Sequence, residues 1–162
     1  MFPLKNYEHQ LPTGDDLGAF GTPRKFDVHT GIDLYTTKDA EVFAIEDGEV
    51  VAIEWFTGPM VKMPWWNNTQ AMAIKGKSGV INYGEVQPHY DIVVGDFVKE
   101  GDHIGWITPV LKKDKGVVPS TSMLHVELYS EYKGKWQIWN LGEDKPKNLF
   151  NPYYMLLEEL PK

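Results

Sequence analysis

Short apolar segments separated by turn-forming residues run through the middle of the chain. Each is too short for a typical helix. Glycine, together with a nearby aspartate or lysine, stands between nearly all of them, which is typical of the turns that connect strands. Many short strands at close spacing predict a mostly β fold, an antiparallel sandwich or barrel-like sheet. The predicted strands are 41–45, 49–53, 71–75, 80–83, 92–94, 103–107, 124–129 and 136–139.

The chain reads as a single domain over residues 1–162, with no repeat and no linker. Proline and glycine interrupt residues 1–25, which we expect to form an irregular lead-in to a core at 26–130. Asp47-Gly48 is typical of a hairpin turn between its two flanking strands. Residues 131–162 should form a hairpin and then a short C-terminal helix, because Asn151 and Pro152 are typical of a helix start.

Charge and composition exclude several functions. The net charge is −7, which disfavours nucleic acid, because nonspecific affinity for it depends on Lys and Arg. There is no cysteine, so any metal must be held by His, Asp or Glu. No segment is long enough to insert into a membrane and no signal peptide is evident, so we expect synthesis in the cytoplasm.

Three residues are candidate metal ligands. His29 and Asp33 flank Gly31, whose backbone freedom allows an imidazole and a carboxylate to turn onto one point. His125 lies far along the chain and would complete the site only if the fold brings it to the other two. A lone histidine is more often a surface or core residue than a ligand, so the residues alone leave both interpretations open.

Residues 25–53, KFDVHTGIDLYTTKDAEVFAIEDGEVVAI, resemble the lysostaphin-type (LytM-type) zinc metallopeptidases, which cut peptide cross-links in bacterial cell walls. That family has His-x-Gly-x-Asp, a short loop and then a hairpin. The resemblance continues in the family's order through 79–84, 94–105 and 124–128. An ordered set of motifs is more specific than any single one.

The resemblance implies a LytM-type β fold and one zinc ion bound by His29, Asp33 and His125. A fourth position would be left for water, as in catalytic zinc sites. Zinc would lower the pKa of that water and polarise the scissile carbonyl. The implied substrate is a peptide of bacterial peptidoglycan. Such a substrate lies outside the cell membrane, so we expect a protein that is phage-associated or released at lysis.

Two positions depart from the family pattern. Glu85 stands where the family has histidine after Tyr-Gly, and Met123 stands where it has the first histidine of His-x-His. Those histidines are the family's non-ligand catalytic pair. Glu85 could act as general base, could ligate the metal and close the site, or could be a surface carboxylate. Met123 cannot donate a hydrogen bond, so His89 or Tyr83 is the candidate catalytic donor.

The sequence therefore favours an altered zinc hydrolase, with an inactive zinc-binding domain that binds a peptide, glycan or protein partner as the alternative. The aromatic-rich segment 55–68 could be a hairpin loop over the sheet edge or one wall of a substrate groove. Arg24 could bind a substrate carboxylate or be an ordinary surface residue. A biotinyl-carrier function for Lys62 is disfavoured, since it leaves the candidate ligands unexplained.

Overall fold

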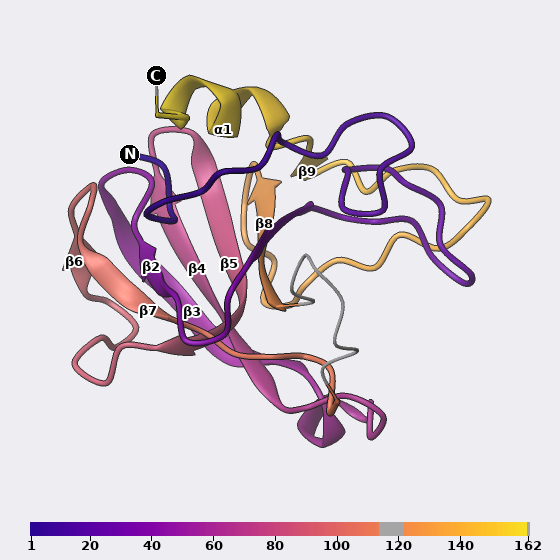
Figure 1. The fold of residues 1–162 in the computed structure, drawn as a ribbon, viewed down its shortest axis with the longest axis horizontal. Coiled ribbons are helices and arrows are strands. Elements are labelled where there is room, and N and C mark those ends of the chain that lie inside the picture. Colours follow the sequence, from indigo (N-terminus) through magenta and orange to yellow (C-terminus); the bar gives the residue numbers. More distant parts are fainter. Residues whose placement is uncertain (114–121, 162) are drawn as a thin grey trace.

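The computed structural model describes residues 1–113 and 122–161. It contains one sheet, one short 3-10 helix and one α-helix (Figure 1). The elements are β1 (Ile32–Thr36), β2 (Glu41–Phe43), β3 (Gly48–Thr57), η1 (Pro59–Val61), β4 (Thr69–Gly76), β5 (Gly79–Pro88), β6 (Phe97–Val98), β7 (His103–Ile107), β8 (Ser122–Tyr129), β9 (Leu149–Phe150) and α1 (Tyr153–Glu159).

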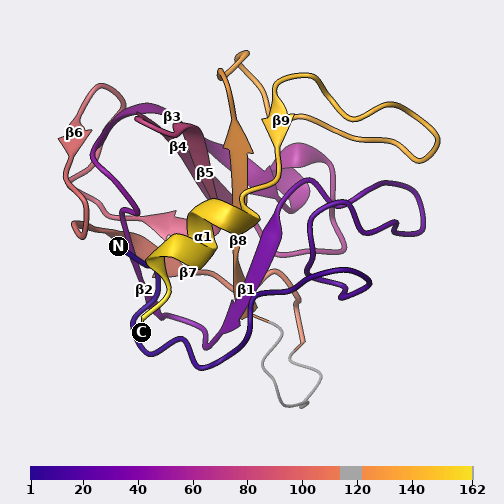
Figure 2. The same cartoon turned by 90° about the horizontal axis from the view of Figure 1, so that it is seen from above.

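The strands follow the order β1-β8-β5-β4-β3-β6, and every pair is antiparallel. Strand β7 joins β2 to β5, and β9 pairs with the end of β8. Helix α1 lies across one end of this sheet, close to the N-terminus, as Figures 1 and 2 show. The prediction of a mostly antiparallel β fold with a short C-terminal helix is confirmed.

The core lies against the long central strands. Side chains such as Met72, Ile81 and Leu124 are almost fully buried there, which supplies most of the driving force for the fold. Residues 1–25 contain no helix or strand, yet Phe2 and Leu4 are buried in the same core. The irregular lead-in therefore covers part of the sheet.

The predicted hairpin at Asp47-Gly48 is wrong. Strands β2 and β3 do not pair with each other, because β2 pairs with β7 while β3 pairs with β4 and β6. Gly48 is itself a strand residue, and a Cβ atom there would come 2.6 Å from both Ile74 Cγ2 and the Lys75 carbonyl oxygen. Glycine is needed at this position for close strand packing, not for a turn.

Two of the predicted strands do not form. Residues 92–94 lie in the connection between β5 and β6, which has one turn closed by the hydrogen bond from Ile92 N to the His89 carbonyl and a second closed by that from Asp96 N to the Val93 carbonyl. Residues 136–139 are irregular and pack beside the sheet, and the partner of β8 near the C-terminus is the two-residue strand β9 instead. Both segments are rich in apolar residues, but neither joins the sheet, so their residue pattern alone did not make a strand.

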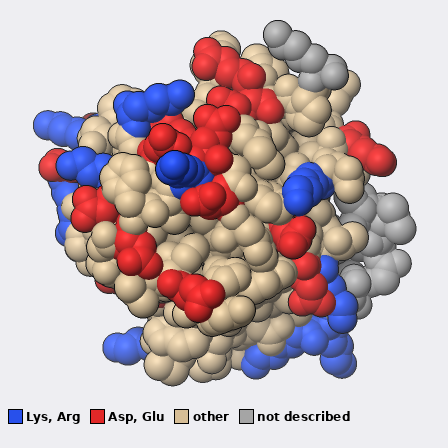
Figure 3. All heavy atoms as spheres, turned by 90° about the vertical axis from the view of Figure 1, so that its left-hand side faces the viewer, with Lys and Arg blue, Asp and Glu red and all other residues tan. Residues whose placement is uncertain are grey.

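Acidic and basic side chains are interspersed on the face shown in Figure 3. The negative net charge is therefore not gathered into one patch on that face. Among the helices of residues 1–113 and 122–161, none is long and apolar enough to cross a membrane.

Candidate metal centre

His29, Asp33 and His125 converge on one point. Asp33 Oδ1 lies 3.1 Å from His29 Nε2 and 2.8 Å from His125 Nδ1, and the two imidazole nitrogens are 3.2 Å apart. All three residues are buried. The fold brings His125 to the other two because Asp33 and His125 are direct cross-strand partners in the β1–β8 pair.

Gly31 permits this approach. A Cβ atom built on Gly31 would lie 2.4 Å from the Val126 carbonyl oxygen and 2.8 Å from two atoms of the His125 ring. Any larger residue would push β8 or the His125 ring away. The glycine of the His-x-Gly-x-Asp motif is thus needed for close packing against β8, rather than only for local folding.

The backbone hydrogen bond of His29 leaves its Nε2 lone pair facing the metal group. His29 Nδ1 lies 2.9 Å from the Ala19 carbonyl oxygen, which can only accept, so Nδ1 carries the proton and Nε2 faces Asp33. Two imidazole nitrogens and one carboxylate oxygen, within 4.8 Å of one another, form a donor set that suits zinc. The residues present therefore fit the ion that the sequence predicts.

Asp33 is held in its ionised form. Burial opposes its charge, but the close contacts of Asp33 with the His125 and His29 rings outweigh burial and keep the pKa of Asp33 well below its usual range. Its second oxygen, Oδ2, accepts a hydrogen bond from Arg24 Nη2 at 3.0 Å. The structure thus places the Arg24 guanidinium on a candidate ligand, where it orients the Asp33 carboxylate.

Glu85 lies on a β-bulge beside this group. The β4–β5 register pairs Gln70 with Val86 but Ala71 with Gly84, so Glu85 is the extra residue, and its φ of 63° is in the left-handed region. A bulge of this kind re-aims a side chain, and Glu85 lines the cavity that adjoins the metal group. Its Oε2 is buried and has no hydrogen-bond partner among the described residues.

The environment of Glu85 narrows the three roles that the sequence left open. Burial, and then the charge of Asp33, raise the pKa of Glu85 to about 8. A plain surface carboxylate would not have one oxygen buried without a hydrogen-bond partner. Among residues 1–113 and 122–161, the group with ligand atoms within 4.8 Å of one another contains His29, Asp33 and His125 but not Glu85. The Glu85 carboxylate therefore stands beside this group of three and not within it.

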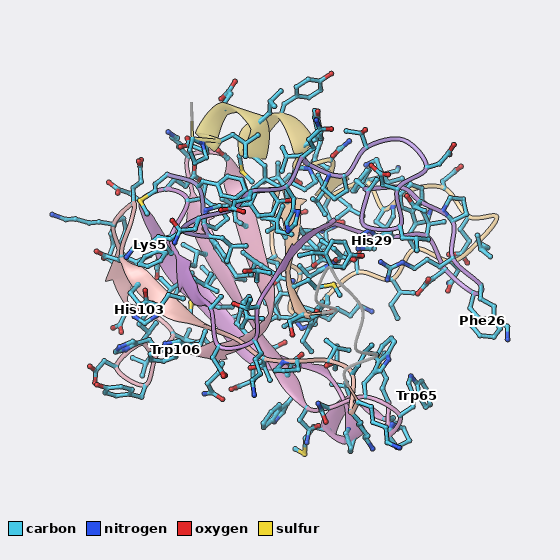
Figure 4. The ribbon with its side chains drawn as sticks, in the orientation of Figure 1. Lys5, Phe26, His29, Trp65, His103 and Trp106 are labelled. Carbon is cyan, nitrogen blue, oxygen red and sulfur yellow. The ribbon has the colours of Figure 1, made fainter. Side chains whose placement is uncertain are left out.

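The structure does not bring His89 or Tyr83 to the site. The His89 ring stacks on Trp106, with ring centroids 5.2 Å apart, and on Tyr90, and it is not among the described residues that line the cavity. Figure 4 shows that Trp106 and the neighbouring His103 lie well away from His29. The Tyr83 hydroxyl is fully buried and accepts a hydrogen bond from the Ile45 backbone N–H. Neither residue supplies the donor that Met123 lacks.

A cavity of about 390 Å³ adjoins the ligand group. Segment 55–68 forms one of its walls, and residues 135–139 form another. The aromatic-rich segment thus lines the cavity, while Trp65 projects outward from it with 63% of its surface exposed (Figure 4). The side chains that these two segments contribute are Phe56, Thr57, Val61, Met63, Trp66, Lys135, Trp136, Gln137, Ile138 and Trp139.

Sequence reasoning missed several residues around the site. Glu127 contacts His125, and its position two residues further along β8 was a usable signal, since alternate residues of a strand share one face. Trp136 and Trp139 line the cavity from an irregular segment, and no sequence pattern placed that segment beside the ligands. The Ala19 carbonyl is a backbone group and left no signal at all.

The model of peptidase family M23 matches residues 27–137, which is more than half of the chain. The chain belongs to this family of zinc peptidases. Comparison with curated proteins finds no match.

Solved structures of similar fold agree with this assignment. The catalytic domain of the antimicrobial peptidase lysostaphin from Staphylococcus simulans is 18% identical, with a TM-score of 0.58 and 92% of each chain covered. A zinc-containing peptidase from Vibrio cholerae is 21% identical, with a TM-score of 0.52, over 78% of this chain and 35% of that one. A LytM protein from Ruminococcus gnavus is 19% identical, with a TM-score of 0.51, over 95% and 59% of the two chains. At these identities the likeness shows the fold.

Proposed function

We propose that the protein is a zinc peptidase that hydrolyses a peptide bond in bacterial peptidoglycan, with Glu85 in place of a catalytic histidine. The observation that carries this proposal is a half-buried carboxylate with one buried oxygen, beside three converging ligands and at the wall of a cavity. The peptide substrate follows from membership of family M23, and peptidoglycan from the resemblance to lysostaphin-type enzymes.

Each site residue has a distinct role. His29, Asp33 and His125 would hold the ion, and Arg24 would keep the Asp33 carboxylate in orientation. Bound zinc would polarise the scissile carbonyl and lower the pKa of the attacking water. Glu85 would accept the proton of that water and pass it to the leaving amine, which requires a carboxyl group whose pKa lies near the working pH.

The cavity would bind the substrate beside these residues. Its walls carry Phe56, Trp66 and Trp136. Aromatic walls of this kind exclude water and contact a bound substrate over a large area. Exclusion of water strengthens the electrostatic interactions at the reacting bond.

One observation favours the second candidate, an inactive zinc-binding domain. Met123 offers no hydrogen bond, and neither His89 nor Tyr83 lies at the site to replace the missing donor. Such a domain would keep zinc and the cavity, and it would bind a peptide or glycan without cutting it.

A cleavage assay distinguishes the active peptidase from the inactive zinc-binding domain. Zinc-loaded protein is incubated with purified peptidoglycan, and released fragments are measured by mass spectrometry with and without a chelator. We expect metal-dependent cleavage, and the Glu85→Gln variant should keep one zinc per chain while it loses about 10²- to 10⁴-fold in rate. Peptidoglycan that is bound but uncut by fully loaded wild type would establish the inactive domain. A Glu85→Gln variant that loses its zinc would make Glu85 a ligand instead.

A further inference from the structure

We propose that Glu127 is a positioning residue for the metal centre, which it serves by fixing the His125 ring. The inference rests on the proposed zinc site and adds a residue to it. Glu127 Oε1 lies 3.2 Å from His125 Nε2, the ring nitrogen opposite the one that faces Asp33. A carboxylate at this place makes Nε2 the protonated nitrogen and leaves the lone pair of Nδ1 for the ion.

The Glu127 carboxylate is enclosed by donors. Thr30 Oγ1 donates to Oε1 at 2.5 Å, while Asn82 Nδ2 and the Tyr129 hydroxyl donate to Oε2 at 2.6 and 2.8 Å. With His125, four polar groups contact this one side chain, and Glu127 is only 1% exposed. A buried charge is tolerated only when it is hydrogen-bonded in this way.

These partners come from three parts of the fold. Asn82 of β5 is the cross-strand partner of Glu127, and Thr30 belongs to the turn that carries His29 and Gly31. One side chain therefore ties β5, β8 and the metal-binding turn together around His125. His125 and Glu127 are two residues apart on β8, so both side chains lie on the same face of the strand.

The charge of Glu127 matters as well as its shape. An amide of the same size would have to turn its NH₂ group toward two of the surrounding donors, so it could not accept all four hydrogen bonds. It would also bind the His125 N–H more weakly, because hydrogen bonds to an ionised acceptor are about twice as strong. A looser His125 ring that populates both tautomers would bind zinc less tightly.

A matched pair of variants tests this role. Glu46 is also a buried carboxylate, which accepts hydrogen bonds from Ser78 N at 2.9 Å and Ser78 Oγ at 2.7 Å. It is not among the described residues that line the cavity. We measure the zinc dissociation constants of wild type, Glu127→Gln and Glu46→Gln by competition with a chromogenic chelator. The thermal unfolding of each metal-free protein is measured alongside.

We expect Glu127→Gln to weaken zinc binding by about 10- to 100-fold. Glu46→Gln should leave zinc affinity unchanged even if its metal-free stability falls. The positioning role is overturned if Glu127→Gln binds zinc as wild type does, or if both variants lose affinity in proportion to lost stability. Wild type that binds no zinc would overturn the proposed metal site itself, so the two failures are distinguishable.

A measurement on the wild type covers the case in which Glu127→Gln does not fold. In zinc-loaded protein labelled with nitrogen-15, the His125 ring should show a proton on Nε2 and none on Nδ1. A proton on Nδ1 would overturn the proposal, because the ring would then face Glu127 with its lone pair.

Discussion

Asp33 Oδ1 and His125 Nδ1 lie 2.8 Å apart, although 92 residues separate them in the chain. The β1–β8 register makes the two residues direct partners, so the metal group exists only when this strand pair has formed. Binding of zinc should therefore stabilise the folded state, since the unfolded chain has no such site.

Zinc affinity should rise with pH. Burial opposes the charged imidazolium of His125, but its hydrogen bonds to Asp33 and Glu127 outweigh burial and raise the pKa of His125 to about 10 in the metal-free protein. His125 then carries an extra proton at neutral pH, which zinc must displace. We expect affinity to increase about tenfold per pH unit between pH 6 and 8 as one proton is lost. Titration calorimetry in two buffers of different ionisation enthalpy counts that proton, and an affinity independent of pH would contradict the prediction.

The rate of hydrolysis should also rise with pH through the ionisation of Glu85. Burial and the charge of Asp33 raise the pKa of Glu85 to about 8 in the metal-free protein, and only the ionised form can accept a proton. A bound dication favours that form, so the midpoint in the zinc enzyme should lie below 8. The measurement is kcat/KM against pH. If kcat/KM of the Glu85→Gln variant rises with pH as that of wild type does, the rise reports the ionisation of another group.

Gly31→Ala should damage the site by steric pressure. The new methyl group would meet the Val126 carbonyl at 2.4 Å and the His125 ring at 2.8 Å, so β8 must shift. We expect a loss of about 1–3 kcal/mol in the free energy of unfolding, together with weaker zinc binding. Gly142→Asn is the control, because nothing lies within 4 Å of that position and Asn tolerates its positive φ. Equal effects of the two changes on zinc affinity would count against the packing argument.

Trp66→Ala should weaken substrate binding more than Trp65→Ala. The two indoles are neighbours, but Trp66 lines the cavity whereas Trp65 is 63% exposed and is not among the described lining residues. Loss of an aromatic wall should raise KM roughly tenfold or more, with little change in kcat. Steady-state kinetics on a soluble peptidoglycan fragment measures both. If Trp65→Ala has the larger effect, the substrate lies outside this cavity.

The local parts of the fold and the site could be predicted from the sequence. Short apolar segments between turn-forming residues identify β4, β5 and β8, because a strand that is buried on both faces leaves such a run wherever it pairs. The pairing of His29 with Asp33 was likewise predictable, since Gly31 and a spacing of four residues bring them together locally.

Other positions were misjudged because their roles depend on distant backbone. Asp47-Gly48 has the composition of a turn, yet its neighbours pair with β4, β6 and β7. His89 is near Glu85 in sequence, but β5 continues past the bulge and carries His89 into a stack with Trp106.

The sequence by itself determined the long strands β3, β4, β5 and β8, the His29-x-Gly31-x-Asp33 turn and the family, because each depends on residue types at short spacing. Only the tertiary structure decided that His125 meets Asp33, that Arg24 holds Asp33, and that a bulge turns Glu85 toward the cavity. The physical reason is register: a shift of one residue between two strands moves every side chain to the opposite face of the sheet. Only the packed sheet fixes that register.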